Sequence, residues 1–301
     1  MYKKMLVPLD GSQMSKALLT YAKELANKLD MDVSLLHLYS SEEQESASMR
    51  RIYIERAADS IRDQLGEARE KINARIPDVR GEIIEGYAAE GILRYAEEND
   101  VDLILISTHG RSGVRPLEWA FGSVAEKVLR RSKVPVWLVR AGVTEEAIYK
   151  RWPKRTVLVP LDGSELAEQV LPHVEALAIK WGADLMNITL FVVSESMLLP
   201  SYYPLEWPLS WDDHLVKSKK INEEYAARIE KRLRAAGLTV HSEVVAGKAA
   251  DQIVDYTERR KCDLIALTTH GRSGLSRWAY GSVSEKVMRR VTSQVLLVRS
   301  S

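Results

Sequence analysis

The stretch Leu6–Ser12 reads LVPLDGS, and the same seven letters return at Leu158–Ser164, 152 positions later. Seven consecutive identities do not arise by chance, and a period of this length is typical of a duplicated domain rather than of a solenoid of short repeats. The chain of 301 residues is long enough for two domains. The sequence therefore predicts one domain over residues 1–141, a linker over 142–154 and a second domain over 155–301.

The repeat continues along the rest of each half. The shared positions include a glycine followed two positions later by Ala-Ala, the start of an aliphatic strand, a polar loop and a Gly-Ser-Val turn. The matched segments are Gly86–Ala89 with Gly247–Ala250, Asp102–Ile104 with Asp263–Ile265, Thr108–Gly113 with Thr269–Gly274, and Gly122–Val124 with Gly281–Val283.

Short aliphatic runs alternate with helical periodicity within each half. Apolar residues at threes and fours, such as Ile54, Ala58 and Ile61, predict a long amphipathic helix. This alternation is typical of a parallel sheet covered on both faces. We expect an α/β fold of two tandem doubly wound, Rossmann-like domains, each with a five-stranded parallel sheet and a ligand outside the strand carboxyl ends. In the first half, strands are expected at 5–8, 33–39, 79–84, 103–107 and 134–140, and helices at 14–29, 49–76, 88–99 and 123–131.

The composition narrows the classes of function. Lys and Arg number 43 against 42 Asp and Glu, so charge gives no reason to expect binding to nucleic acid or to a membrane surface. The sequence starts without a signal-peptide pattern and has no apolar run long enough to span a bilayer, so we expect a cytoplasmic protein. The single cysteine, Cys262, is expected to be buried and inert.

Candidate binding residues lie where the first strand of each half ends. Pro8 and Asp10 lead into a Gly-Ser turn, and Pro160 and Asp162 repeat the arrangement. A carboxylate at the ligand edge of a parallel sheet can accept hydrogen bonds from an amino group or from hydroxyls. The alternative is that Asp10 or Ser12 only caps the following helix, with the same alternative in the second half.

A second candidate is the polar loop after the fourth strand, together with the helix that follows it. Loop glycines let backbone N–H groups approach a phosphate, and a helix that opens on Gly-Ser favours an anion. Ser123 with Glu126 and Ser282 with Glu285 also have capping-box spacing, which needs no ligand. The features together, occurring twice, favour the phosphate interpretation. The residues are Ser107, His109, Gly110, Gly113, Gly122, Ser123 and Val124 in the first half, and Thr268, His270, Gly271, Gly274, Gly281, Ser282 and Val283 in the second.

Other chemistries lack their motifs. There is no GxxxxGK[ST] loop, which excludes a P-loop NTPase, and no Cys/His cluster for a structural zinc. The sequence places no nucleophile or carboxylate beside His109 or His270, so we expect both to have positioning or structural roles.

The second half also contains a long aromatic segment, residues 194–219, which carries Tyr202, Tyr203, Trp207 and Trp211. Two interpretations remain open for it. The segment is a lid or partner surface, or its aromatic side chains fold back over the core of their own domain.

These motifs resemble the universal stress protein family, specifically its tandem two-domain members, over essentially the whole chain. The family's ATP-binding subgroup carries G-x2-G-x9-G-[ST] after the fourth strand. The second half has nine residues between Gly271 and Gly281, with Thr268 in place of the first glycine. The first half has Ser107 at that place and two additional residues in the loop. The fold implied is the one related to adenine nucleotide alpha hydrolases.

The resemblance implies that ATP is the ligand, with Mg²⁺ or Mn²⁺ bridging its phosphates and no metal ligand assigned to the protein. Asp10 and Asp162 would lie at the adenine end, beside the backbone of Leu38 and Leu190. The loop residues would flank the ribose and phosphates, and the Gly-Ser-Val turns would hold the phosphates. The fifth strands would pair within the chain as a pseudo-dimer, and a further homodimer is expected.

Three functions follow from this resemblance. The first is a binding module, in which ATP occupancy changes partner contacts or assembly. The second is a slow ATP hydrolase, for which the sequence identifies no general base. The third is a family member that has lost nucleotide binding and acts through its surfaces.

Overall fold

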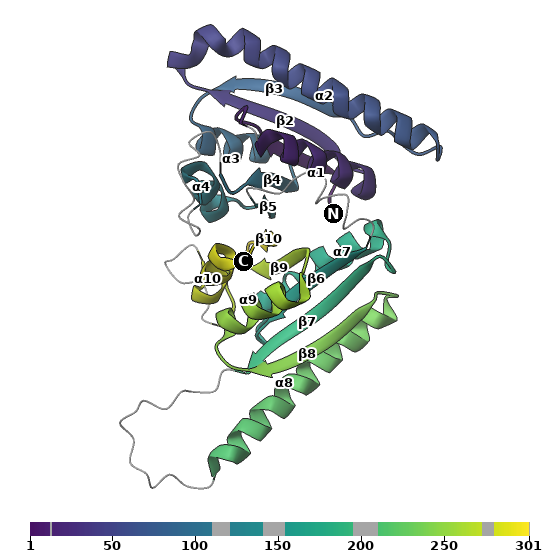
Figure 1. Ribbon diagram of the computed structural model, residues 1–301, viewed down its shortest axis with the longest axis vertical. Coiled ribbons are helices and arrows are strands. Elements are labelled where there is room, and N and C mark those ends of the chain that lie inside the picture. Colours follow the sequence, from purple (N-terminus) through teal and green to yellow (C-terminus); the bar gives the residue numbers. More distant parts are fainter. Residues whose placement is uncertain (13, 110–120, 141–153, 195–209, 273–279, 301) are drawn as a thin grey trace. The chain divides into compact units, whose positions relative to one another are not determined.

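The computed structural model describes residues 1–12, 14–109, 121–140, 154–194, 210–272 and 280–300 (Figure 1). The chain divides into two compact units. The first unit comprises Met1–Pro153 with Thr292–Arg299, and the second comprises Lys154–Val291 with Ser300–Ser301. The last strand of the second repeat therefore belongs to the first unit.

The five strands of the first repeat have the order β3-β2-β1-β4-β5, with every neighbouring pair parallel. Helix α1 packs against α2, and α3 packs against α4. The strand order reverses between β1 and β4, which is the point where doubly wound sheets bind ligands. The elements are β1 (Lys4–Pro8), α1 (Met14–Leu29), β2 (Asp32–Tyr39), η1 (Ser41–Ser46), α2 (Ala47–Glu70), β3 (Val79–Glu85), α3 (Ala88–Glu98), β4 (Leu103–Ser107), α4 (Ser123–Arg131) and β5 (Val136–Val139).

The second unit repeats this plan in the order β8-β7-β6-β9, again parallel, with the reversal between β6 and β9. The elements are β6 (Arg155–Leu161), α6 (Glu165–Glu168), α7 (Leu171–Trp181), β7 (Met186–Ser194), α8 (Ser210–Ala235), β8 (Val240–Ala246), α9 (Ala249–Arg260), β9 (Leu264–Thr268) and α10 (Ser282–Arg290), and the chain continues into β10 (Gln294–Val298) of the first unit.

The helix after the first strand differs between the repeats. In the first unit it is the continuous α1, whereas the second unit has the short α6 followed by α7. Pro172 occupies the first turn of α7. Proline has no N–H to donate to the preceding turn, so it begins a helix more readily than it continues one. The short helix α6 has its own N-cap, which is Ser164.

The expected strands and helices are confirmed, with two differences in length. The helix expected over 49–76 ends at Glu70, Asn73 has a left-handed φ of 50°, and Ile72 is 68% exposed. The end of the expected aromatic loop is helical, because α8 begins at Ser210. Tyr202, Tyr203 and Trp207 lie outside the described residues. Within the described residues, no helix has both the length and the apolar character needed to span a bilayer.

The two fifth strands pair, as the resemblance implies. Within the first unit β10 runs antiparallel to β5, with Leu296 opposite Trp137. The buried side chain of Gln294 holds this edge in place. Its Oε1 accepts from the Trp137 indole N–H at 2.6 Å, and its Nε2 donates to the Tyr21 hydroxyl at 2.5 Å. One amide therefore connects β10, β5 and α1.

Gln294→Leu is expected to lower the free energy of unfolding by about 2 kcal/mol, because the buried Trp137 N–H loses its acceptor and an amide partner of Tyr21 is removed. Urea unfolding followed by tryptophan fluorescence measures the change. The matched control is Gln64→Leu at an exposed position of α2, where we expect a change within about 0.5 kcal/mol. Equal stability of the two variants would contradict this role for Gln294.

Cys262 is buried, as expected, and lies two residues before β9. Burial, with a smaller contribution from the Asp263 carboxylate, raises the pKa of the Cys262 thiol to about 11. A raised thiol pKa favours the neutral form in the folded state. The stability contributed is therefore fully present below pH ~9 and lost as pH rises towards ~11.

At pH 8, a thiol reagent is expected to modify Cys262 at least about 100-fold more slowly in the native protein than in urea, because the native thiolate fraction is lower by about two powers of ten and the sulfur is shielded. Absorbance of the released chromophore gives both rates, and Cys262→Ser supplies the blank. Native and unfolded rates within a factor of ten would show that the thiol is accessible.

Candidate functional site

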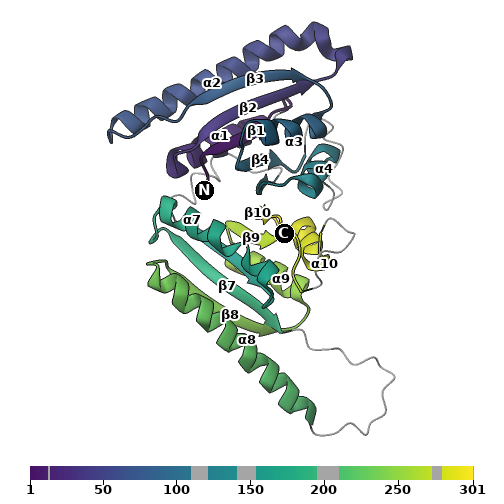
Figure 2. The same cartoon turned by 180° about the vertical axis from the view of Figure 1, so that it is seen from behind.

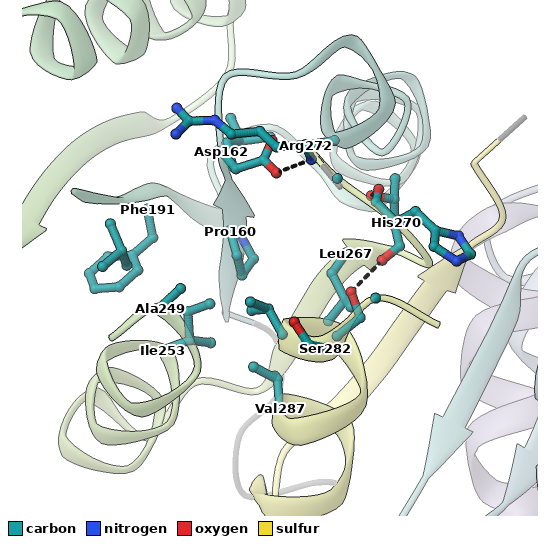
Figure 3. Close-up of a pocket in the computed structure, with 18 residues that line it drawn as sticks. Pro160, Asp162, Phe191, Ala249, Ile253, Leu267, His270, Arg272, Ser282 and Val287 are labelled. Carbon is teal, nitrogen blue, oxygen red and sulfur yellow. Dashed lines mark hydrogen bonds between the residues drawn. The ribbon is translucent and has the colours of Figure 1, made fainter. Parts of the chain in front are cut away.

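The second unit carries a pocket of about 260 Å³ at the carboxyl ends of its strands, beside the start of α10 (Figure 3). Apolar side chains form one end, and polar loop residues with the first turn of α10 form the other. The lining residues are Pro160, Leu161, Asp162, Ala167, Phe191, Val193, Ala249, Ile253, Leu267, Thr268, His270, Gly271, Arg272, Gly281, Ser282, Val283, Ser284 and Val287.

The first unit carries the corresponding pocket, of about 280 Å³. It lies at the reversal between β1 and β4 and has the same two-ended character. The lining residues are Pro8, Leu9, Asp10, Leu18, Leu36, Leu38, Ala88, Ile92, Ile106, Ser107, Thr108, His109, Gly122, Ser123, Val124 and Ala125.

The residues that replace the first motif glycine do not close the pockets. The Thr268 hydroxyl donates to the carbonyl oxygen of His270 at 2.8 Å, and the Ser107 hydroxyl donates to that of His109 at 2.6 Å. Each hydroxyl is thus held by the turn that immediately follows its strand. Both pockets stay open with these side chains in their walls.

The start of α10 shows which backbone donors face the pocket. Gly281 is the N-cap, with no side-chain cap, and its N–H donates to the Thr269 carbonyl oxygen at 2.7 Å. In the first unit Gly122 donates in the same way to Thr108 at 2.8 Å. The glycine amides are therefore used within the protein. The donors left at the helix start are the N–H groups of the first turn, which begins at Ser282 and at Ser123.

The capping-box alternative is wrong. Ser123 and Ser282 are the first residues of their helices rather than N-caps. Glu285 is bonded to Arg289 one turn later, at 3.1 Å. Neither helix start has a side-chain cap, and the first-turn N–H groups favour an anion through the helix dipole.

Asp162 links two segments that are far apart in sequence. Its Oδ1 accepts from the Ser164 N–H at 3.0 Å and from the Ser164 hydroxyl at 2.6 Å, and its Oδ2 accepts from the Arg272 N–H at 2.7 Å. Gly271 leaves room for this carboxylate, since a Cβ there would lie 2.1 Å from Oδ2. Asp162 therefore fixes the loop after β9 against the end of β6.

The helix-capping alternative holds for one of the residues that it named. Ser164 caps α6, because its hydroxyl accepts from the Ala167 N–H at 3.1 Å. Asp10 accepts from the Ser12 N–H at 2.9 Å, which is the same turn as Asp162 makes with Ser164. Both aspartates nevertheless line their pockets.

Tyr225 of α8 lies near the same rim. Burial raises the pKa of its hydroxyl, and the carboxylates of Glu168 and Asp162 raise it further. At neutral pH the group is an uncharged phenol, so it adds no charge beside Asp162.

His270 has a structural role. Its side chain is buried and points away from Pro160 and Ser282 (Figure 3). Its Nδ1 contacts the Thr269 hydroxyl at 3.1 Å, and its backbone N–H donates to the Ser300 hydroxyl at 3.2 Å. These bonds fix the loop against the C-terminal residues of the second unit. Only the backbone of His270 is directed to the pocket side.

Most of the residues that the sequence predicted line the two pockets. Some of the lining residues were not predicted. Leu190 is fully buried and is not among the lining residues; Phe191 and Val193 are. The strand register gives the reason. Pro8 pairs with Leu36 and Pro160 pairs with Phe191, so Phe191 corresponds to Leu36 and Val193 corresponds to Leu38. Gly110, Gly113 and Gly274 lie outside the described residues.

Arg272, Ser284, Ile92 and Ile253 line the pockets but were not predicted from the sequence, although Ile92 and Ile253 occupy matching positions in the repeat.

Known proteins match this chain along both halves. Residues 1–140 and 154–299 each match the Universal stress protein family. The universal stress protein YxiE of Bacillus subtilis is 36% identical over 152 residues, which are 46% of this chain and 100% of that protein. The universal stress protein MJ0531 of Methanocaldococcus jannaschii is 29% identical over 154 residues, 51% of this chain and 84% of that protein. A universal stress protein structure from Archaeoglobus fulgidus shares the fold, with a TM-score of 0.63 at 20% identity, covering 99% and 98% of the two chains.

Gly271→Ala is expected to lower the free energy of unfolding by about 2 kcal/mol or more, because its Cβ would overlap the Asp162 carboxylate. Gly281→Ala is the matched control in the same loop. Its Cβ would lie 3.4 Å from the nearest heavy atom, so we expect a loss of no more than about 1 kcal/mol. Denaturant unfolding measures both variants, and a larger loss at Gly281 would overturn this account of the loop.

Proposed function

This chain belongs to the universal stress protein family, and we propose that each of its two pockets binds an adenine nucleotide, with ATP as the ligand. Nucleotide occupancy would then alter the surface that the protein presents to partners. The observation that carries the proposal is the pairing, in each pocket, of an apolar end with a helix start whose first-turn N–H groups have no side-chain cap.

The apolar end suits a planar base. In the second unit Phe191, Ile253 and Leu267 line it, and in the first unit Leu36, Leu38 and Ile106 do. A heteroaromatic ring gains from leaving water at such a surface, because each Å² of buried apolar area contributes about 25 cal/mol.

The polar end suits phosphate. Each charge–dipole contact at a helix start contributes about 0.3–1 kcal/mol at an exposed site, so several donors have to act together. The first turn of α10 supplies the N–H groups of Ser282 and Val283 together with the Ser282 hydroxyl. Arg272 also lines the pocket, but its guanidinium lies beside Gly163 and points away from Ser282 (Figure 3). The arrangement favours an anionic group linked to a base.

A divalent cation would bind to this site together with the phosphates of the nucleotide. In the described residues, no three His, Cys, Asp or Glu side chains are grouped as a metal site. Asp162 is occupied by three protein donors. Mg²⁺ or Mn²⁺ would therefore bind together with the phosphates, and the hydroxyls of Ser123 and Ser282 at the helix starts would be available to hold it. Bound there, the metal would neutralise phosphate charge.

The site geometry favours binding over hydrolysis. A general base for water has to reach the nucleophile within hydrogen-bond distance. The ring of His270 points away from the pocket, and Nδ1 of His109 is engaged with the Thr108 hydroxyl at 3.0 Å. We therefore propose a binding module rather than an ATPase.

ATP with Mg²⁺ is expected to stabilise the full chain by about 2.7 kcal/mol at a concentration 100-fold above Kd. In Gly122→Val with Gly281→Val, side chains added at both helix starts would fill the phosphate end, and the ATP-induced rise in Tm should disappear. Thermal unfolding with and without ATP measures this, and each variant is compared with its own ligand-free state.

The matched control is Gly66→Val in α2, where an added Cβ meets nothing within 4 Å and which is not among the residues that line the first pocket. This variant should keep the ATP response. Absence of any shift at millimolar ATP in the unaltered chain would remove the proposal and favour a protein that acts through its surfaces alone.

A further inference from the structure

A second hollow, of about 420 Å³, opens beside the pocket of the first unit. It lies between the first turns of α3 and α4, which lie side by side in Figure 1 and Figure 2. Its lining residues are Tyr87, Ala88, Ala89, Glu90, Ser123, Val124 and Lys127. Ala88, Ser123 and Val124 also line the first pocket, so the two hollows meet at the start of α4.

Tyr87 gives the outer hollow an aromatic wall. It is the N-cap residue of α3, makes no side-chain cap bond, and is 82% exposed. An exposed ring beside a hollow offers a face on which a planar base can stack. Such a stack strengthens binding by about tenfold, and it tolerates any base because every base has a π-face.

The charges at the junction suit an anion. Glu90 faces two cations, with Lys127 Nζ and Arg131 Nη1 each 3.7 Å from its Oε1. One carboxylate against two cations leaves a positive excess. Both contacts are longer than a hydrogen bond, and the Lys127 side chain is 57% exposed. Lys127 can therefore turn to a phosphate without giving up a short ion pair.

We propose that the first unit binds a dinucleoside polyphosphate across the two hollows. This inference rests on the proposed function for one half of the ligand, whose base occupies the inner pocket. The phosphate chain crosses the first turn of α4 beside Lys127, and the second base stacks on Tyr87. A mononucleotide fills only the inner pocket and the junction. The outer hollow matches a second ring system better than a phosphate tail, because Tyr87 and two alanines line it.

The second unit differs from the first at the position of Tyr87. The repeat places Lys248 at the position of Tyr87 and Asp251 at that of Glu90. Asp251 is hydrogen-bonded to Arg290, the counterpart of Arg131. At the position of Tyr87 the second unit thus has a lysine side chain instead of a ring on which a base can stack. The proposal is limited to the first unit, and Lys248 becomes the natural control.

Calorimetric titration of the full chain with AMP, ATP and diadenosine tetraphosphate tests the proposal. Gly281→Val, which fills the second pocket, is included in every variant so that the first unit is observed alone. We expect diadenosine tetraphosphate to bind about tenfold more tightly than ATP. Tyr87→Ala should remove this advantage and leave the ATP affinity unchanged, whereas Tyr87→Phe should retain it. Lys248→Ala should have no effect.

Lys127→Gln should weaken ATP and diadenosine tetraphosphate by a similar factor, and the loss should shrink at high salt. The inference is overturned if the dinucleotide binds no better than ATP, or if its advantage survives Tyr87→Ala. ATP binding with no dinucleotide advantage leaves the proposed function standing, while failure of both ligands to bind overturns the two together.

Discussion

The hydrogen bond from the Gly281 N–H to the Thr269 carbonyl oxygen, with its twin from Gly122 to Thr108, is the contact on which each pocket depends. It ties the start of a helix to the residue that follows a buried strand. The helix therefore begins with a glycine N-cap rather than a side-chain cap, and its first-turn N–H groups are left facing the pocket. A Ser or Asp N-cap at the same place would satisfy one of those donors and weaken the attraction for an anion.

Asp162 completes this arrangement from the opposite side of the pocket. Its carboxylate joins the turn after β6 to the loop after β9, so the two strands at the sheet reversal carry one connected rim. Gly271 is required there because a larger residue would displace the carboxylate. A rim held in this way by one carboxylate is organised without a ligand, and such preorganisation lowers the entropy cost of any binding.

Duplication did not produce two identical sites. The inner pocket of the second unit has Phe191 in its wall where the first unit has Leu36, and the first unit adds an outer hollow faced by Tyr87. Ser284 donates to the Thr268 carbonyl oxygen at 2.8 Å, and Ala125 is its counterpart. The LVPLDGS turn is common to both pockets, and the side chains around it differ.

The sequence by itself determined the duplication, the parallel α/β sheets, the edge at which the pockets lie and most of the lining residues, because aliphatic runs and repeated glycines report burial and backbone freedom directly. Only the tertiary structure decided which atoms face the pocket. The Gly281 amide is used internally, the His270 ring turns away, and Phe191 rather than Leu190 lines the wall. The tertiary structure also decided that β10 belongs to the first unit. Each depends on partners far apart along the chain, such as Asp162 and Arg272. Strand register brings such partners together, and no local pattern records it.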